Sequence, residues 1–169
     1  ADAPRDRNAF IIDRGMMRVV VGMGLFFVAL ILGFLYIFRY ADVCSVGDLL
    51  TLELGEAGVV TRYEQTLLFS IFVWAHFWNM FNARSYATGR SFLQLKHGKG
   101  FMAIVGVIVL GQIIIVELLY NFFNVEPMFH TEDWRFNCDG FVDWITIVGA
   151  TSLVLWVREA WSALRRRVR

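Results

Sequence analysis

Three polar side chains recur at helical spacing inside an otherwise apolar stretch of the sequence. His76, Asn79 and Asn82 are each three residues apart, so on a helix they share one face. Such a stripe can hydrogen-bond to neighbouring helices or help to coordinate a metal ion. A lone histidine is a poor metal site by itself, so helix packing is the commoner role and ion coordination the sharper hypothesis. His76 is therefore a candidate metal ligand within a candidate polar helix face.

The sequence carries none of the motifs of soluble active sites. It has no phosphate-cradling glycine loop, no nucleophile elbow and no metal-ligand cluster. Its two cysteines fit no zinc spacing and are too few for a disulfide scaffold. We therefore expect no catalytic residue and no cofactor in this chain. The net charge of +1 gives no indication of nucleic-acid binding.

The polar stripe lies in the second of four apolar stretches. Of the 169 residues, 57% are hydrophobic and 18% are charged, and the charged residues cluster between the apolar stretches. The first three stretches are about long enough to cross hydrocarbon as helices, in which all backbone amides hydrogen-bond internally. The fourth is marginal in length, so a buried helix of a soluble protein is the alternative for it. The sequence predicts an all-α integral membrane protein, one domain over residues 1–169 that forms a four-helix transmembrane bundle. The expected spans are about residues 17–38, 65–83, 100–123 and 141–157.

Smaller features of the spans predict how they pack. Glu117 lies near the outer end of the third span, and we expect its carboxylate to reach toward interfacial water. Trp144 and Trp156, near the two ends of the fourth span, favour the membrane interfaces. Glycines of the first and third spans indicate close helix contacts; they are Gly22, Gly24, Gly33, Gly106 and Gly111.

The segments between the spans alternate in charge. Basic segments of membrane proteins stay in the cytoplasm, so both termini and the second connecting segment are expected inside, and the first and third outside. The basic residues of the inside segments include Arg5, Arg7, Arg14, Arg18, Arg84, Arg90, Lys96, Lys99, Arg165, Arg166, Arg167 and Arg169. The acidic residues of the outside segments include Asp42, Asp48, Glu53, Glu56, Glu126, Glu132, Asp133 and Asp139.

Cys44 and Cys138 both fall in segments assigned to the outside. They can pair if that compartment is oxidising, although two free thiols are an equally good interpretation. The chain begins at Ala1, and its first residues lack the apolar core and cleavage site of a signal peptide. We therefore expect it to be a piece of a longer protein.

The second span and the residues after it carry the most specific sequence motif. The segment from Phe72 to Arg84, which ends in Asn79-Met80-Phe81-Asn82-Ala83-Arg84, resembles the eighth transmembrane helix of P-type calcium ATPases of the plasma-membrane type. Further similarities cover nearly the whole chain, from the approach to the seventh helix to the tenth. They lie at Pro4-Arg5, Phe10-Ile11-Ile12, Arg90-Ser91-Phe92, Gln112–Val116, Asp143-Trp144, Ser152–Trp156 and Arg158-Glu159.

The resemblance implies a C-terminal support domain of an ATP-driven cation pump in the plasma membrane, with calcium as the favoured cation. Its partners would be lipid and the upstream helices of the same pump. ATP and magnesium would act only in the full-length protein, whose catalytic domains lie upstream. His76 stands about where some relatives place an ion ligand, although histidine is a softer donor than the oxygen ligands that calcium prefers.

A second interpretation stays open. The chain could be a free-standing four-helix membrane protein that serves as an interaction or accessory subunit, because four-helix membrane bundles have many roles. The coding sequence upstream of Ala1 separates the two. An Asp-Lys-Thr-Gly segment in frame favours the pump, and a start codon near Ala1 favours the accessory protein.

Overall fold

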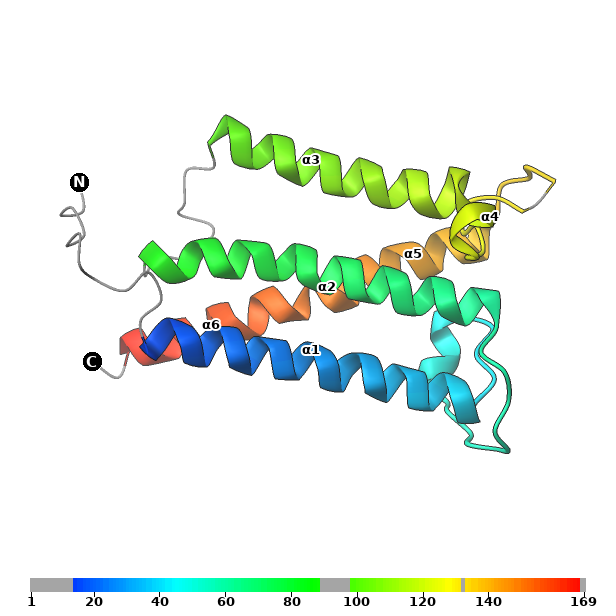
Figure 1. Cartoon of the computed structure of the whole chain (residues 1–169), viewed down its shortest axis with the longest axis horizontal. Coiled ribbons are helices and arrows are strands. Elements are labelled where there is room, and N and C mark those ends of the chain that lie inside the picture. Colours follow the sequence, from blue (N-terminus) through cyan, green and yellow to red (C-terminus); the bar gives the residue numbers. More distant parts are fainter. Residues whose placement is uncertain (1–13, 89–97, 132, 168–169) are drawn as a thin grey trace.

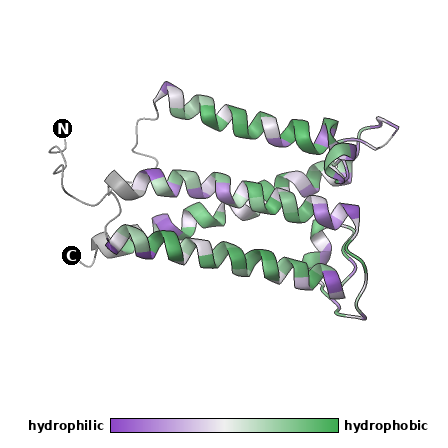
Figure 2. Cartoon of the chain, viewed as in Figure 1, coloured by the Kyte–Doolittle hydropathy of each residue, from purple (hydrophilic) through white to green (hydrophobic). Residues whose placement is uncertain are grey.

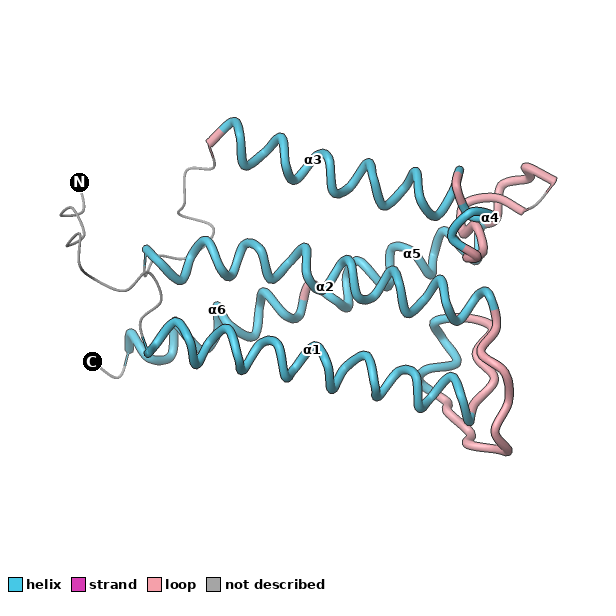
Figure 3. Tube along the Cα trace, in the orientation of Figure 1, coloured by secondary structure: helices cyan, strands magenta, loops and turns pink. Residues whose placement is uncertain are grey.

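The computed structural model describes residues 14–88, 98–131 and 133–167. In this part of the chain the backbone forms helices and loops, with one isolated bridge between His130 and Phe136 and no strand (Figure 3). The all-α prediction is confirmed. The elements in chain order are α1 (Arg14–Tyr40), η1 (Val46–Leu50), α2 (Arg62–Thr88), α3 (Lys99–Ile113), the π-helical η3 (Ile114–Leu118), α4 (Tyr120–Phe123), α5 (Cys138–Thr151) and α6 (Leu153–Arg167).

Three of the described helical segments are long and apolar enough to cross a membrane. They are Arg14–Tyr40, Lys99–Leu118 and Cys138–Ala160, which correspond to the first, third and fourth expected spans. The α2 helix is as long as α1, at 27 residues each, but it is not among the three because polar side chains lower its hydropathy. Figure 2 shows this contrast, with α1 and α3 mostly hydrophobic and α2 mixed.

The α2 helix lies at the centre of the bundle. It contacts α1, α3, α5 and α6, and the long helices run roughly side by side (Figure 1). The start of α1 and the end of α6 lie at one end of the bundle, while η1 and α4 lie at the other. The segments after α1 and after α4 therefore meet at the same end, which we call the η1 end.

Large apolar side chains of α2 fill the core. Leu67, Ile71, Trp74 and Phe77 are buried, and they pack with Phe38 of α1, Val116 of η3 and Ile147 of α5. Trp144 of α5 is half-buried and packs against the aromatic face of α2, with its ring centroid 5.1 Å from that of Trp74. The expected place of Trp144 at a membrane interface stays a prediction.

The fourth expected span is divided into α5 and α6 at Ser152. The Thr151 hydroxyl donates to the Ile147 carbonyl at 2.7 Å, and the Ser152 hydroxyl donates to the Gly149 carbonyl at 2.6 Å. Hydroxyls that bond back to the preceding turn compete with the backbone ladder and often bend helices. Two adjacent hydroxyl residues therefore account for a break that hydropathy alone does not indicate.

The glycine expectation is also wrong in this structure. At Gly22, Gly24, Gly33, Gly106 and Gly111, nothing lies within 4 Å of the position that a Cβ would occupy. These glycines leave open space instead of bringing helices together. A different glycine is closely packed: at Gly140 a Cβ would stand 2.1 Å from the carbonyl oxygen of Met128.

Candidate functional site

The polar stripe of α2 lies opposite the first half of α1 and the start of α6. His76, Asn79 and Asn82 line a cavity of ≈ 300 Å³ with Met23 and Gly24 among its α1 walls. The α6 helix contributes Arg158 to the same cavity. The exposure of the stripe falls along α2, from an exposed His76 through a half-buried Asn79 to a buried Asn82.

His76 is surrounded by aromatic rings. Its imidazole stacks on Phe27 of α1, with centroids 3.9 Å apart and planes inclined by 21°. The ring of Phe72, one turn earlier on α2, meets it edge-on at 4.4 Å. No group of three or more His, Cys, Asp or Glu that could hold a metal ion occurs among the described residues. The metal role of His76 stays a hypothesis.

Asn82 joins the centre of the bundle to α6. Its side-chain Nδ2 donates to the carbonyl oxygen of Val154 at 2.8 Å, across the start of α6. The Arg158 guanidinium, one turn further along α6, donates to the Asn82 carbonyl and to the Ser85 hydroxyl. Because Asn82 and Ser85 are buried, these bonds fix α6 against α2 where little water competes.

The last residues of the Asn-Ala-Arg motif face in different directions. Ala83 is exposed and lines the small cavity. Arg84 places its guanidinium 4.5 Å from the ring centroid of Phe101 on α3, which is cation–π distance. The motif therefore contacts α6 through Asn82 and α3 through Arg84, and these are packing contacts.

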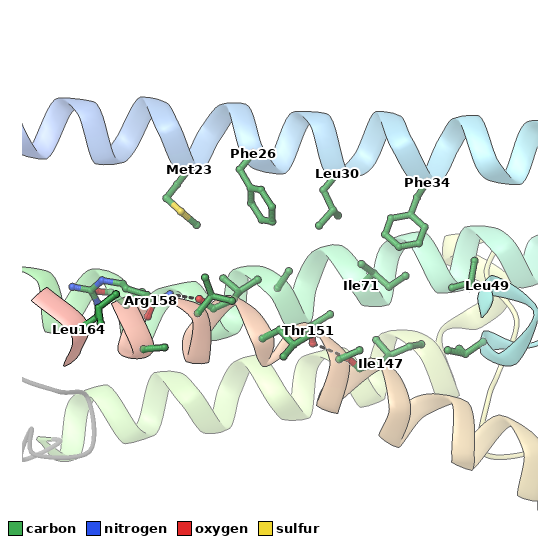
Figure 4. Close-up of a pocket in the computed structure, with 18 residues that line it drawn as sticks. Met23, Phe26, Leu30, Phe34, Leu49, Ile71, Ile147, Thr151, Arg158 and Leu164 are labelled. Atoms are coloured by element: carbon green, nitrogen blue, oxygen red, sulfur yellow. Dashed lines mark hydrogen bonds between the residues drawn. The ribbon is translucent and has the colours of Figure 1, made fainter. Parts of the chain in front are cut away.

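A large apolar groove runs beside the stripe, between α1 and the α5–α6 pair. Its volume is ≈ 880 Å³, and nearly all of its lining side chains are hydrocarbon. Figure 4 shows Met23, Phe26, Leu30 and Phe34 pointing from α1 toward the opposite wall, which Ile71, Ile147 and Thr151 help to form. Asn82 and Arg158 add polar atoms to the same lining.

Carboxylates bind backbone amides at the η1 end. Glu64 is buried and forms a capping box with Thr61: its Oε2 accepts from the Thr61 amide at 2.7 Å, and the Glu64 amide donates to the Thr61 hydroxyl at 3.2 Å. Its Oε1 accepts from the Val43 amide at 3.2 Å. The Thr-x-x-Glu pattern of residues 61–64 was the available sequence signal for this contact.

Asp143 of α5 makes a second such contact. Its side chain is buried, Oδ1 accepts from the Val46 amide at 3.2 Å, and Oδ2 accepts from the Tyr63 hydroxyl of α2. In η1, Asp48 accepts from the amides of Cys44 and Ser45, and these bonds hold the pKa of Asp48 below its usual value. These carboxylates thus hold the connecting segments in place by accepting hydrogen bonds from backbone amides. The number of acidic residues in the sequence did not predict this role.

Glu117 corrects a sequence expectation. Its side chain is buried instead of reaching toward water, and it lies in η3. The carboxylate accepts from the amides of Met128 at 3.2 Å and Phe129 at 2.9 Å. The segment after α4 folds back over η3 and brings these amides to the carboxylate, which replaces water as their partner.

Cys44 and Cys138 are both exposed free thiols in this structure. Their pairing under oxidation stays a prediction. The Asp42 carboxylate raises the pKa of the Cys44 thiol above its usual value, and slight desolvation and the Asp48 carboxylate add to this effect.

A family comparison gives this arrangement its context. Residues 1–164 match the family described as "Cation transporting ATPase, C-terminus". The chain belongs to this family. The three described helical segments that are long and apolar enough to cross a membrane agree with this family.

A curated relative carries a more specific name. The chain is 35% identical over 74 residues, 44% of its length, to "Calcium-transporting ATPase 7, plasma membrane-type" from Oryza sativa subsp. japonica. The matched part is 7% of that relative's length. No solved structure matches the chain.

Proposed function

We propose that this C-terminal domain supports the ion-translocating helices of an ATP-driven calcium pump in the plasma membrane. The family match supports a cation pump, and the name of the rice relative supports calcium and the plasma membrane. On this proposal α1, α2, α3 and the α5–α6 pair are four membrane spans with both termini in the cytoplasm. ATP and magnesium act on other domains of the complete protein.

The apolar groove between α1 and α5–α6 carries the support role. Its ≈ 880 Å³ is lined almost entirely by apolar side chains, so an apolar occupant would pack against them. A transmembrane helix of the same pump fits this chemistry, and such a helix is always present at the same membrane depth. Asn82 and Arg158 in the lining offer hydrogen-bonding groups for a polar position on that helix.

A substitution that fills the groove tests this proposal in the full-length pump. Ala150 of α5 lines the groove, whereas Ile145 is exposed on the same helix and is absent from the groove lining. Ala150→Trp should lower the yield of folded pump and its ATP-dependent calcium uptake, and Ile145→Trp should change both much less. Equal effects of the two substitutions would count against an intramolecular helix in the groove. Lipid in the groove would instead predict a defect that depends on acyl-chain length.

The accessory-protein alternative makes a different prediction. In that case the reading frame upstream of Ala1 begins with a nearby start codon and encodes no Asp-Lys-Thr-Gly segment. The groove would then be filled by a separate partner, and the purified chain would copurify with that partner. An upstream frame that encodes the phosphorylation motif favours the pump.

A further inference from the structure

His130, in the segment after α4, has acceptors against both of its ring nitrogens. Nε2 lies 2.8 Å from the carbonyl oxygen of Glu117, and Nδ1 lies 2.8 Å from the carbonyl oxygen of Thr131. A carbonyl oxygen can only accept, and a neutral imidazole has a single N–H. The imidazolium, with two N–H groups, is the form that makes both bonds.

The surroundings of the ring also favour a positive charge. Glu117 belongs to η3, at the end of the helix that starts with α3, and the last carbonyls of a helix carry partial negative charge. Its carboxylate Oε2 lies 3.9 Å from Nε2. The indole of Trp134 stacks on the imidazole at 4.1 Å with planes 11° apart, an arrangement that attracts a cation.

Trp134 reaches this position with a strained backbone conformation. Its φ is 58°, in the left-handed region that side chains other than glycine rarely adopt. Trp134 is 65% exposed, so burial of this residue does not compensate for the strained conformation. The stack on His130 is the contact that the conformation provides.

We propose that His130 is a proton-dependent switch: its imidazolium ties the segment after α4 to the end of η3, and loss of the proton releases that segment. The proposal concerns the aqueous compartment at the η1 end and does not depend on which ion the pump carries. Among the described residues, the charged group that lies beside Nε2 is the Glu117 carboxylate of η3. The α4 helix presents the Tyr120 ring at 6.0 Å, and Asp133 and Arg135 flank Trp134 on the histidine's own segment.

Burial opposes the charged ring, but the hydrogen bonds to Thr131 and Glu117 and the Glu117 carboxylate outweigh it and raise the pKa of His130 above its usual value. A raised folded-state pKa stabilises the segment fully below about pH 6.5, the ordinary histidine value, and this stabilisation disappears as pH rises through the folded-state value. Alkaline pH should therefore loosen the segment.

Amide hydrogen exchange of the full-length protein in lipid nanodiscs tests the switch. The reporters are the amides of Met128, Phe129, Trp134 and Asn137, each of which donates within this region. After correction for intrinsic rates, their exchange should rise about tenfold between about pH 5.5 and pH 8.5, the size expected for one charge-assisted hydrogen bond. Amides of α2 should not change.

His130→Gln should give fast exchange at both pH values, because glutamine keeps a donor but cannot become a cation. Glu126→Gln, on an exposed side chain of the same segment, is the matched control and should retain the pH response. Exchange in the wild-type protein that is independent of pH would overturn the proposal, whatever the variants do. A pH response that persists in His130→Gln would assign it to another group.

Discussion

The side-chain amide of Asn82 donates to the carbonyl oxygen of Val154 at 2.8 Å and so connects the last third of α2 to the first turn of α6. Hydropathy predicts that both residues lie on helices, but it does not predict that these two helices are neighbours. The bond identifies the structural task of the motif that makes this sequence recognisable.

Replacement of Asn82 by alanine should destabilise the domain. The change removes the Val154 bond, and hydrogen bonds between membrane helices contribute about 0.6–2 kcal/mol. Thermal unfolding in detergent, followed by circular dichroism, measures the effect. Asn79→Ala, a matched change one turn earlier at a half-buried position, should cost less. Equal losses would show that the Val154 bond is not the important one.

Gly140→Ala should loosen the start of α5. The new Cβ would stand 2.1 Å from the carbonyl oxygen of Met128, so the backbone must shift, at a cost of about 1–3 kcal/mol. Gly149→Ala, on the same helix, meets nothing within 4 Å and should be neutral or stabilising by up to about 1 kcal/mol. Unfolding midpoints of the two variants would be compared in one detergent. A neutral Gly140→Ala would contradict the close approach.

Asp42→Asn should make Cys44 more reactive. The Asp42 carboxylate raises the pKa of this thiol, so its removal lowers that pKa and increases the thiolate fraction at neutral pH. Since the thiolate is the nucleophile, maleimide labelling of Cys44 at pH 7 should be faster in the variant. The difference should shrink as pH rises above the thiol pKa. Labelling of Cys138 in the same samples provides the internal reference.

Sidedness can be tested with a membrane-impermeant thiol reagent. The alternation of charge predicts that Cys44 and Cys138 are reached from outside the cell. A cysteine at the exposed Lys99, in a background without the two native cysteines, should be reached only after the membrane is permeabilised. Labelling of both Cys44 and Lys99→Cys in intact cells would invalidate the predicted topology and with it α2 as a membrane span.

The chain alone should neither hydrolyse ATP nor accumulate calcium. Phosphoryl transfer needs a nucleotide cradle and a magnesium site, and the described residues gather no acidic or histidine cluster that could hold a metal. Purified chain in liposomes would be assayed for both activities against empty vesicles. Activity in either assay would favour an independent transporter over a support domain.

Hydropathy was sufficient to predict where the long helices lie in the sequence and that three of them could cross a membrane. A membrane span needs apolar side chains over its full length, and composition alone reveals such a stretch. The internal details depend on contacts that composition does not carry. Glu117 was expected near water, yet it is buried, because the two amides that it binds come from a segment more than ten residues later. The Ser152 break rests on local hydroxyl bonds that leave hydropathy unchanged.

The candidate site could be predicted only in part from the sequence. Helical spacing placed His76, Asn79 and Asn82 on one face, and they do line one cavity. Their partners were not predictable, since Phe27 and Val154 look like any other apolar positions in their spans. The role of Asp143 was missed for a related reason: a carboxylate that binds an amide of a distant segment is indistinguishable in sequence from one that faces solvent. The role of Glu64 was also missed, although the Thr-x-x-Glu pattern was an available signal.

The carboxylate–amide contacts at the η1 end also affect how ions in the surrounding water respond to this domain. Glu64, Asp143, Asp48 and Glu117 each direct their negative charge at backbone N–H dipoles, which partly offset the electric field that the charge projects outward. The electrostatic potential at this surface is therefore weaker than the number of acids suggests. Mobile cations should accumulate there less than a count of formal charges would indicate, and changes in ionic strength should perturb these connecting segments little.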